Sequence, residues 1–286
     1  MLPRQKAIYE NFRVLDSSGR LLFRAGQKRL DWYLSRGLAK RIDPETIQLT
    51  FANKGDGRRN EPFYLQDMQN KCVVCGSSQA LTQHHIVPYQ YRQYMPEAIK
   101  SRSSYDLLPL CMKCHDTYER SAIKFKQHIA ACFGAPLDGV GWEERPEIGR
   151  AGKAAAALLS RNDRIPNARL DQLKDIVRDV AASHCSLLSA DSQAQLLAAD
   201  AADLPDVLRE LCELKARVRG PEFQDHGEIV VGMLADSSNV SGMCQDCSQM
   251  CAAGVGGMIR AWRKHFVDCA CPHHLPDHWV VGYPIS

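Results

Sequence analysis

The 286-residue sequence contains no apolar run long enough to span a membrane, and no apolar signal segment opens it. It also contains no internal repeat and no long low-complexity segment. A disulfide framework is not indicated either. Although there are twelve cysteines, the chain is long and several of them stand in Cys-x-x-Cys pairs. We therefore expect a soluble intracellular protein in a reducing compartment, without contact to a membrane.

Acidic residues are outnumbered in the first part of the chain and basic residues in the second, so the two parts have opposite net charges. Residues 1–130 contain 21 Lys and Arg against 12 Asp and Glu, whereas residues 131–286 contain 15 against 21. A basic front half is typical of a region that meets a polyanion, although solvated surface charge alone can give the same asymmetry. With 45% hydrophobic residues, the chain is long enough for one large or two ordinary domains.

The hydrophobic pattern predicts an α+β protein with three regions. Residues 1–60 form a small N-terminal unit with a strand, turn and strand around Ser17, Ser18 and Gly19, a helix from residue 27 to residue 38, and a strand from residue 46 to residue 51. Residues 53–60 lack apolar side chains and predict an exposed loop. Residues 61–134 carry the chemistry, and residues 135–286 are mostly helical.

Alanine-rich and leucine-rich stretches support the helical assignment of this last region. Helices are expected over residues 151–160, 167–182, 191–202, 206–219 and 258–267. Residues 229–231, with the sequence Ile-Val-Val, are the expected exception and predict a short strand.

Two Cys-x-x-Cys pairs provide the most specific signal in the sequence. They are Cys72 with Cys75 and Cys111 with Cys114. Each pair can form a knuckle that directs two thiolates to one side, and four thiolates complete the tetrahedral coordination of zinc. Because such a site leaves no position open for water or substrate, we expect a structural zinc ion that contributes to folding.

The residues around these knuckles resemble the HNH (ββα-metal) endonucleases. Thr82-Gln83-His84-His85-Ile86-Val87-Pro88 lies between the knuckles, Asp106-Leu107-Leu108-Pro109-Leu110 precedes the second knuckle, and His115 follows Cys114. The resemblance implies a strand that ends at His85, a loop over residues 88–105, a second strand over residues 107–110, and a helix from about residue 113 towards residue 131.

The same resemblance assigns catalytic roles. His85 would be the general base, and His84 with His115 would bind one catalytic Mg²⁺ or Mn²⁺ ion. Asp106 stands where that family usually has Asn, and it would ligate the ion or orient an imidazole.

Basic side chains near these motifs suggest contacts with nucleic acid phosphates, although basic positions on a helix are commonly just solvated. The candidates are Arg92, Lys100, Arg102, Lys113, Arg120 and Lys124. Tyr89, Tyr91, Tyr94 and Tyr105 offer stacking surfaces or core residues.

Nearly the whole chain is also similar to the C-terminal half of the 3′–5′ exonuclease domain-containing proteins. The similarity includes Tyr9-x-Asn11, Cys72-Val73-Val74-Cys75-Gly76, His226-Gly227 and Trp262-Arg263-x-His265-Phe266. It implies a mitochondrial or nuclear location. The sequence lacks recognisable exonuclease acidic motifs, so we expect the HNH-like half without an exonuclease domain and without exonuclease activity.

Further cysteines lie in the last 45 residues. Cys244, Cys247 and Cys251 stand in a Ser/Gly-rich stretch, and Cys269 and Cys271 precede a Pro-His-His segment. They allow a second metal site in principle, but the fold of the Ser/Gly-rich stretch is unclear and Cys269 with Cys271 has no matching partner knuckle, so reduced structural thiols are favoured.

Together these features predict a metal-dependent nuclease of the HNH type that hydrolyses phosphodiester bonds in DNA or RNA, with a zinc-bearing ββα-metal module between the two flanking regions. The alternative is a non-catalytic nucleic-acid-binding or scaffold subunit of a ribonucleoprotein particle, such as an organellar ribosome, with a protein or ribonucleoprotein partner bound through the C-terminal region. A zinc-dependent protein-interaction module is a third possibility, and it predicts weak dependence of binding on salt.

Overall fold

A computed structural model describes residues 3–53, 55, 58, 60–100, 103–160, 165–236, 250 and 252–285. These residues form both helices and strands, so the expected α+β class is confirmed. The chain divides into two compact units, Met1–Asp138 with Asp225–Ser286, and Gly139–Gln224. The second unit is thus inserted in the sequence of the first, and the division at residues 60 and 134 stays a prediction. None of the described helices has the length and apolar character needed to cross a membrane.

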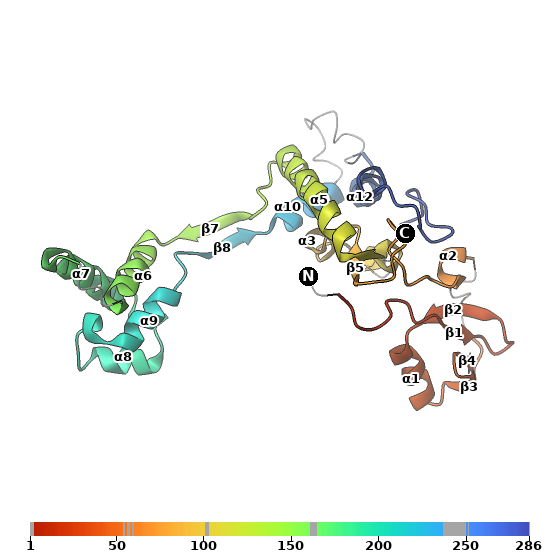
Figure 1. Ribbon diagram of the computed structural model, residues 1–286, viewed down its shortest axis with the longest axis horizontal. Helices are drawn as coiled ribbons and strands as arrows, with labels where there is room; N and C mark the ends of the chain where they lie inside the picture. Colours follow the sequence, from red (N-terminus) through yellow and green to blue (C-terminus); the bar gives the residue numbers. More distant parts are fainter. Residues whose placement is uncertain are drawn as a thin grey trace. The chain divides into compact units, whose positions relative to one another are not determined.

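A four-stranded sheet begins the first unit (Figure 1). Its strands are β1 (Phe12–Leu15), β2 (Leu21–Ala25), β3 (Ala39–Asp43) and β4 (Thr46–Leu49), in the order β2-β1-β4-β3, and α1 (Gln27–Ser35) lies between β2 and β3 in the chain. Val14, Leu22 and Ile47, on three neighbouring strands, are buried and form the core of this sheet. The predicted hairpin at Ser17–Gly19 is therefore confirmed, whereas β3 was missed because most of its side chains are exposed.

A β-hairpin followed directly by a long helix forms the centre of the unit. The short helix α2 (Pro62–Leu65) precedes it, β5 (Leu81–His85) pairs antiparallel with β6 (Leu107–Cys111), and α5 covers Met112–Phe133. The strand ends and the helix agree with the expected positions. The segment 88–105, expected to be a loop, contains α3 (Tyr89–Arg92), α4 (Glu97–Lys100) and the 3₁₀ turn η1 (Ser103–Asp106).

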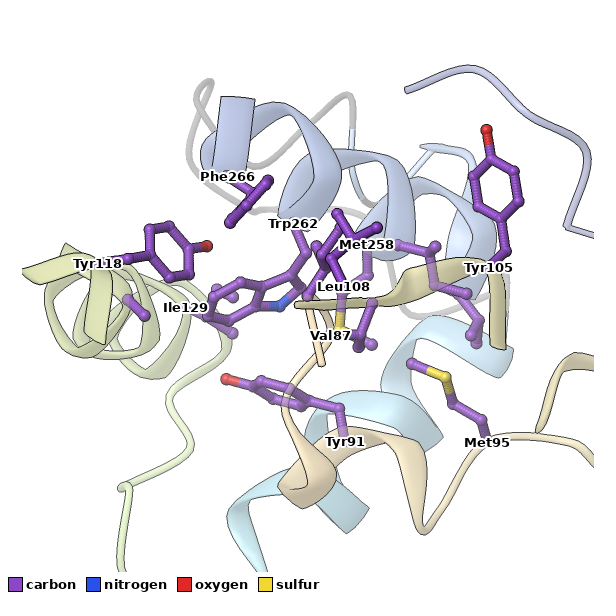
Figure 2. Close-up of a cluster of buried hydrophobic side chains, with 14 of the residues drawn as sticks. Val87, Tyr91, Met95, Tyr105, Leu108, Tyr118, Ile129, Met258, Trp262 and Phe266 are labelled. Carbon is purple, nitrogen blue, oxygen red and sulfur yellow. The ribbon is translucent and has the colours of Figure 1, made fainter. Parts of the chain in front are cut away.

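Two helices from the end of the chain complete this core. They are α10 (His226–Ala235) and α12 (Gly254–Ala270). Trp262 and Phe266 of α12 are fully buried, and Figure 2 shows them near Tyr118 and Ile129 of α5. The Phe266 and Tyr118 rings meet at a centroid distance of 5.0 Å. The core is thus built from segments more than 100 residues apart in sequence.

The strand expected at residues 229–231 is wrong, because these residues lie inside α10. The Asp225 side chain accepts a hydrogen bond from the Gly227 backbone N–H and caps the helix. Val230 and Val231 are both buried. Burial on several sides removes the polar alternation by which a helix is recognised, so an apolar run of this length is ambiguous.

The second unit is a small helical bundle joined to a two-stranded ribbon. Its elements are β7 (Val140–Glu144), α6 (Pro146–Leu159), α7 (Asn167–Ser183), η2 (Cys185–Leu187), α8 (Ala190–Leu196), η3 (Ala201–Asp203), α9 (Pro205–Glu213) and β8 (Arg217–Gln224). β7 and β8 pair antiparallel. The helices expected over 191–202 and 206–219 are therefore too long, since the first breaks after Leu196 and residues 217–219 begin β8.

Candidate functional site

Four cysteine thiols converge where the β5–β6 hairpin meets α5. Cys72 and Cys75 precede β5, Cys111 ends β6, and Cys114 lies in the first turn of α5. Their sulfur atoms lie within 4.8 Å of one another, and the Cys75 and Cys111 sulfurs are 3.7 Å apart. Four sulfurs at about 2.3 Å from a tetrahedral zinc ion are about 3.8 Å apart, so the spacing fits such an ion.

The local backbone holds the first knuckle in its turn. The Gly76 backbone N–H donates to the Cys72 carbonyl at 2.9 Å, and Gly76 has a φ of 77°, which favours glycine. Hydrogen bonding from the Ser77 backbone lowers the pKa of Cys75 to about 7, whereas burial raises the pKa of Cys72. A thiolate is the form that ligates a metal, and the knuckle supplies one at a nearly neutral pH.

A second group of possible ligands consists of His84, His115 and Glu119. One ligand atom from each lies within 4.8 Å of the other two. His84 Nδ1 is 3.1 Å from His115 Nε2, and Glu119 Oε1 is 3.7 Å from the former and 3.6 Å from the latter. Ligands at about 2.0–2.1 Å from a tetrahedral ion are about 3.3 Å apart, so this group also fits a divalent cation, with a fourth position open.

Hydrogen bonding fixes the tautomer of His115. The Thr82 hydroxyl donates to the Leu110 carbonyl at 2.8 Å, so its oxygen accepts from His115 Nδ1–H at 2.7 Å. In the neutral imidazole, Nε2 then carries the lone pair with which His115 can ligate a cation, whereas a protonated ring donates from Nε2 to Glu119. Partners of this kind orient histidine ligands in metal sites.

Burial and charge favour the ligand forms of this group. Burial is the largest cause that lowers the pKa of His84, to about 3, so its imidazole is neutral at pH 7. A hydrogen bond with His115 lowers the pKa of Glu119 and keeps its carboxylate ionised. Two imidazole nitrogens and one carboxylate oxygen are ligand atoms that both zinc and harder divalent ions accept.

His85 is the last residue of β5 and follows His84 directly. Adjacent strand residues point to opposite faces, so the two imidazoles leave the strand on different sides. The His85 side chain is half-buried, and its Nδ1 is buried without a hydrogen-bond partner among the described residues. Burial, with a smaller effect from the Arg92 charge, lowers the pKa of His85 to about 4.

Asp106 does not join the histidines, contrary to its expected role as a ligand. Its two carboxylate oxygens accept from Arg263 Nε at 2.6 Å and from Arg263 Nη2 at 3.0 Å, and both side chains are buried. Arg263 also donates to the Tyr283 carbonyl at 2.9 Å. Because a bidentate guanidinium occupies both oxygens, Asp106 connects the hairpin to α12, and Glu119 is the carboxylate that lies beside the two histidines.

Sequence reasoning therefore missed Glu119 and Arg263. The spacing His115-x-x-x-Glu119 on a predicted helix was a usable signal, because residues four apart lie on one helix face. Arg263 offered no comparable signal, since its partner is 157 residues away.

The basic candidates are dispersed over several elements. Lys113, Arg120 and Lys124 are exposed on α5, and Arg92 and Lys100 lie on α3 and α4. Arg102 lies outside the described residues. Whether any of them contacts nucleic acid stays a prediction.

Of the cysteines near the end of the chain, Cys269 and Cys271 are free and exposed. Cys269 Sγ is 3.5 Å from His265 Nε2. Cys244, Cys247 and Cys251 lie outside the described residues. Cys132 forms a disulfide bond, which was not expected for a chain in a reducing compartment.

Three relatives show what the chain is similar to. It is 28% identical to exonuclease 3′–5′ domain-containing protein 2 of Drosophila melanogaster and 26% identical to the human protein of that name, in both cases over 98% of this chain. It spans 44% and 41% of these two relatives. It is 33% identical to protein RRP6-like 3 of Arabidopsis thaliana, over 60% of this chain and 22% of the relative. No protein-family model and no solved structure matches it.

These relatives correct the expected family. The chain resembles proteins named for a 3′–5′ exonuclease domain, and the relatives above are not named as HNH endonucleases. Its assignment to the HNH endonucleases, as a half without the exonuclease domain, is therefore wrong. The expectation that this chain lacks exonuclease activity depended on that assignment and is no longer supported.

Proposed function

We propose that this chain takes part in the metal-dependent hydrolysis of phosphodiester bonds in nucleic acid, at the group formed by His84, His115 and Glu119. The observation that carries the proposal is the geometry of this group, in which three ligand atoms face one another across 3.1–3.7 Å. The names of the relatives, which refer to a 3′–5′ exonuclease domain, support the choice of nucleic acid as substrate.

The two ligand groups have different roles in this proposal. The four thiols bind a structural zinc ion that fastens the hairpin to α5, and the whole forms a metal-bearing ββα unit. The second group binds a divalent cation, Mg²⁺, Mn²⁺ or Zn²⁺, which when bound neutralises charge on the phosphate. His84 and His115 hold their lone pairs in place, and Glu119 supplies the negative charge.

His85 acts as the general base in this proposal. Its imidazole takes the proton from the attacking water, and its position after His84 in the chain keeps it within electrostatic range of that ligand. Since the two rings leave β5 on opposite faces, the assignment of the base is separable from that of the cation ligands. Mutation of each residue therefore tests a different part of the proposal.

Cleavage of labelled DNA and RNA, single-stranded and double-stranded, tests the function in the presence of Mg²⁺, Mn²⁺ or Zn²⁺. Substrates labelled at the 5′ or at the 3′ end distinguish stepwise removal of nucleotides from internal cuts. Glu119→Gln should abolish cleavage and cation binding, and His85→Gln should reduce the rate by roughly 100- to 10,000-fold while the cation still binds. Glu213→Gln and His273→Gln, at exposed residues elsewhere, serve as controls.

Each result separates the candidates. Wild-type activity in His85→Gln would remove the base from the proposal and leave the cation group. Absence of cleavage on every substrate, with salt-sensitive binding retained, would favour a nucleic-acid-binding scaffold with a protein or ribonucleoprotein partner.

A further inference from the structure

A pocket of about 310 Å³ lies beyond the end of β5, lined by residues of α3, α4 and α12. Val87, Met95, Ile99 and Ile259 provide apolar walls, and Arg92 with Lys100 provides positive charge. A volume near 300 Å³ is at the lower end of the range for small-molecule sites. The pocket can therefore accept one planar group with a charged substituent, but not a base-paired double helix.

Arg92 supplies a cation that lacks a carboxylate partner among the described residues. Its side chain is half-buried, and its Nε donates to the Val87 carbonyl at 3.0 Å. Asp106 also lines the pocket, but its two oxygens are bound by Arg263. The Asp106 charge acts on Arg92 but is shared with Arg263, so a phosphate would give this partly desolvated guanidinium a direct anionic partner.

Tyr89 supplies an aromatic surface next to this cation. Its side chain is 67% exposed, and its ring centroid lies 5.8 Å from the Arg92 guanidinium carbon. An exposed tyrosine beside an arginine is a combination on which unpaired bases stack in proteins that bind single strands. Apolar walls, an aromatic face and a guanidinium without a carboxylate bonded to it among the described residues together match a base attached to its phosphate.

The wall that carries Tyr89 and Arg92 is fixed before any ligand binds. A Cβ atom on Gly227 of α10 would lie 1.8 Å from the Gln90 carbonyl oxygen, so the backbones of α10 and α3 touch there. The Tyr91 hydroxyl donates to His226 Nε2 at 2.8 Å, and His226 Nδ1–H donates to the Ala135 carbonyl at 2.8 Å. Preorganisation of this kind reduces the entropy lost on binding.

The pocket also adjoins the proposed catalytic residues. The Arg92 charge acts on His85, and the Ile86 backbone N–H donates to the Asp106 carbonyl at 2.9 Å. A nucleotide in the pocket would therefore place its phosphate beside the end of β5.

We infer that this pocket, which we call the Arg92 pocket, binds one unpaired nucleobase and its phosphate, and that the substrate class is single-stranded nucleic acid. The inference rests on the proposed function, because the phosphate next to the bound base would lie on the side of His85, the proposed general base. Bases of a duplex would first have to unstack and unpair, which is unfavourable by a few kcal/mol per base. Single strands and frayed ends should therefore bind more tightly than intact duplexes.

Binding measured without added divalent cation tests the pocket separately from hydrolysis. The probes are short fluorescein-labelled single strands of DNA and of RNA, a blunt duplex of the same length, and a single strand whose bases are replaced by abasic sites. Fluorescence anisotropy with the full chain gives Kd as a function of salt. The variants are Tyr89→Ala with Tyr89→Phe as its match, Arg92→Gln with Arg92→Lys as its match, and Lys153→Ala at an exposed position of α6 as the control.

We expect Tyr89→Ala to weaken single-strand binding about tenfold and Tyr89→Phe to leave it unchanged, since the ring does the stacking. Arg92→Gln should reduce the slope of log Kd against log salt by about 0.7, the contribution of one phosphate contact on a single strand, and Arg92→Lys should keep it. The abasic strand and the duplex should both bind about tenfold more weakly than the intact strand.

Equal affinity for the intact strand, the abasic strand and the duplex would overturn the Arg92 pocket, as would equal binding by Tyr89→Ala and Tyr89→Phe. The difference between DNA and RNA shows whether the 2′-hydroxyl contributes. Base-dependent binding without cleavage would remove the proposed function and keep the pocket. Cleavage together with binding that does not depend on the bases would keep the proposed function and remove the Arg92 pocket.

Discussion

The four-thiol group and the group of His84, His115 and Glu119 both take residues from the β5–β6 hairpin or its ends and from α5, but they differ in completeness. The first provides four ligands of one kind, which close a tetrahedral site. The second provides three ligands of two kinds, with the half-exposed Glu119 at its edge. A closed site can only stabilise the fold, whereas a site with an open position can also receive a substrate oxygen.

The two groups also differ in the contacts that hold their ligands in place. The cysteines are held by turns of the backbone, such as the bond from the Gly76 N–H to the Cys72 carbonyl. The histidines are held by side chains, through Thr82 on His115 and aromatic contacts of His84 with Tyr118 and Phe266. We therefore expect loss of the first group to affect folding and loss of the second to affect cation-dependent chemistry.

The largest effect is expected for Cys111→Ser. Binding of structural zinc by four thiolates contributes on the order of 10 kcal/mol in small zinc-dependent folds. Its loss is comparable to the whole stability of a domain, so the first unit should unfold. Zinc content per chain and thermal unfolding followed by circular dichroism measure the effect.

Cys212→Ser is the matched control, because Cys212 is an exposed free cysteine of the second unit. It should leave zinc content and the unfolding temperature unchanged. A Cys111→Ser variant that folds like the wild type would mean that the four thiols do not stabilise the fold through a metal.

Asp106→Asn should have the next largest effect, and it separates a structural carboxylate from a ligand. The substitution leaves Arg263 buried with a neutral partner, and an uncompensated buried charge destabilises by about 3–5 kcal/mol. Binding of the divalent cation should remain, since Asp106 does not belong to the cation group. Urea unfolding and cation titration by calorimetry distinguish the two roles.

Asp268→Asn provides the comparison for an exposed ion pair, because Asp268 and Lys264 are 53% and 71% exposed. Its effect should stay below about 1 kcal/mol. If Asp106→Asn lost cation binding but kept its stability, Asp106 and not Glu119 would be the carboxylate ligand of the cation.

Glu119→Gln should show the opposite pattern. The amide keeps the shape of the side chain but removes the negative charge, so cation affinity should fall at least about 100-fold, as it does when partners of metal ligands are lost. The unfolding free energy without added cation should change by no more than about 0.5 kcal/mol, because the side chain is half-exposed. A large loss of stability in this variant would make the second group structural as well, and the contrast between the two groups would disappear.

The sequence predicted the local parts of this arrangement better than the long-range parts. The Cys-x-x-Cys spacing brings the thiols into two turns, and the predicted strand ends and the start of α5 agree with the structure. Glu119 could have been found from its distance of four residues to His115. A role for Glu119 as a ligand also requires His84, however, and His84 comes close to Glu119 only because β5 pairs with β6.

Asp106 shows why the rest could not be predicted. Its neighbours in sequence suggest a ligand, but its role is decided by Arg263, which α12 brings back after an intervening helical unit. A single sequence contains no periodicity that links residues so far apart. The segment 229–231 was wrongly predicted as a strand for a related reason. It is buried inside α10, so it lacks the polar positions by which a helix is recognised in the sequence.

The smallest effect concerns His226, a buried histidine that ligates nothing and so contrasts with His84. Burial is the largest cause that lowers the pKa of His226, with a smaller effect of Lys126, while a hydrogen bond to Ala135 and the charge of Asp225 oppose it. The unfolded chain therefore binds this proton more readily than the folded chain. Stability from this residue is present above the unfolded pKa of about 6.5 and decreases as the pH falls below it, by at most about 1.4 kcal/mol per pH unit.

His226→Gln should thus make the acid side of the stability curve shallower by one proton, while a glutamine can still bond to Tyr91 or Ala135. Urea unfolding between pH 7 and the acid limit of folding gives the slope, which should exceed that of the variant only below about pH 6.5. His84 has a lowered pKa for the same main reason, and a bound cation should deepen its dependence on acid because protons compete for the ligand. A cation-dependent slope in the His226→Gln background that disappears when Glu119→Gln is added would identify the second group as the ligands. A slope that does not respond to added cation would mean that this group binds no ion.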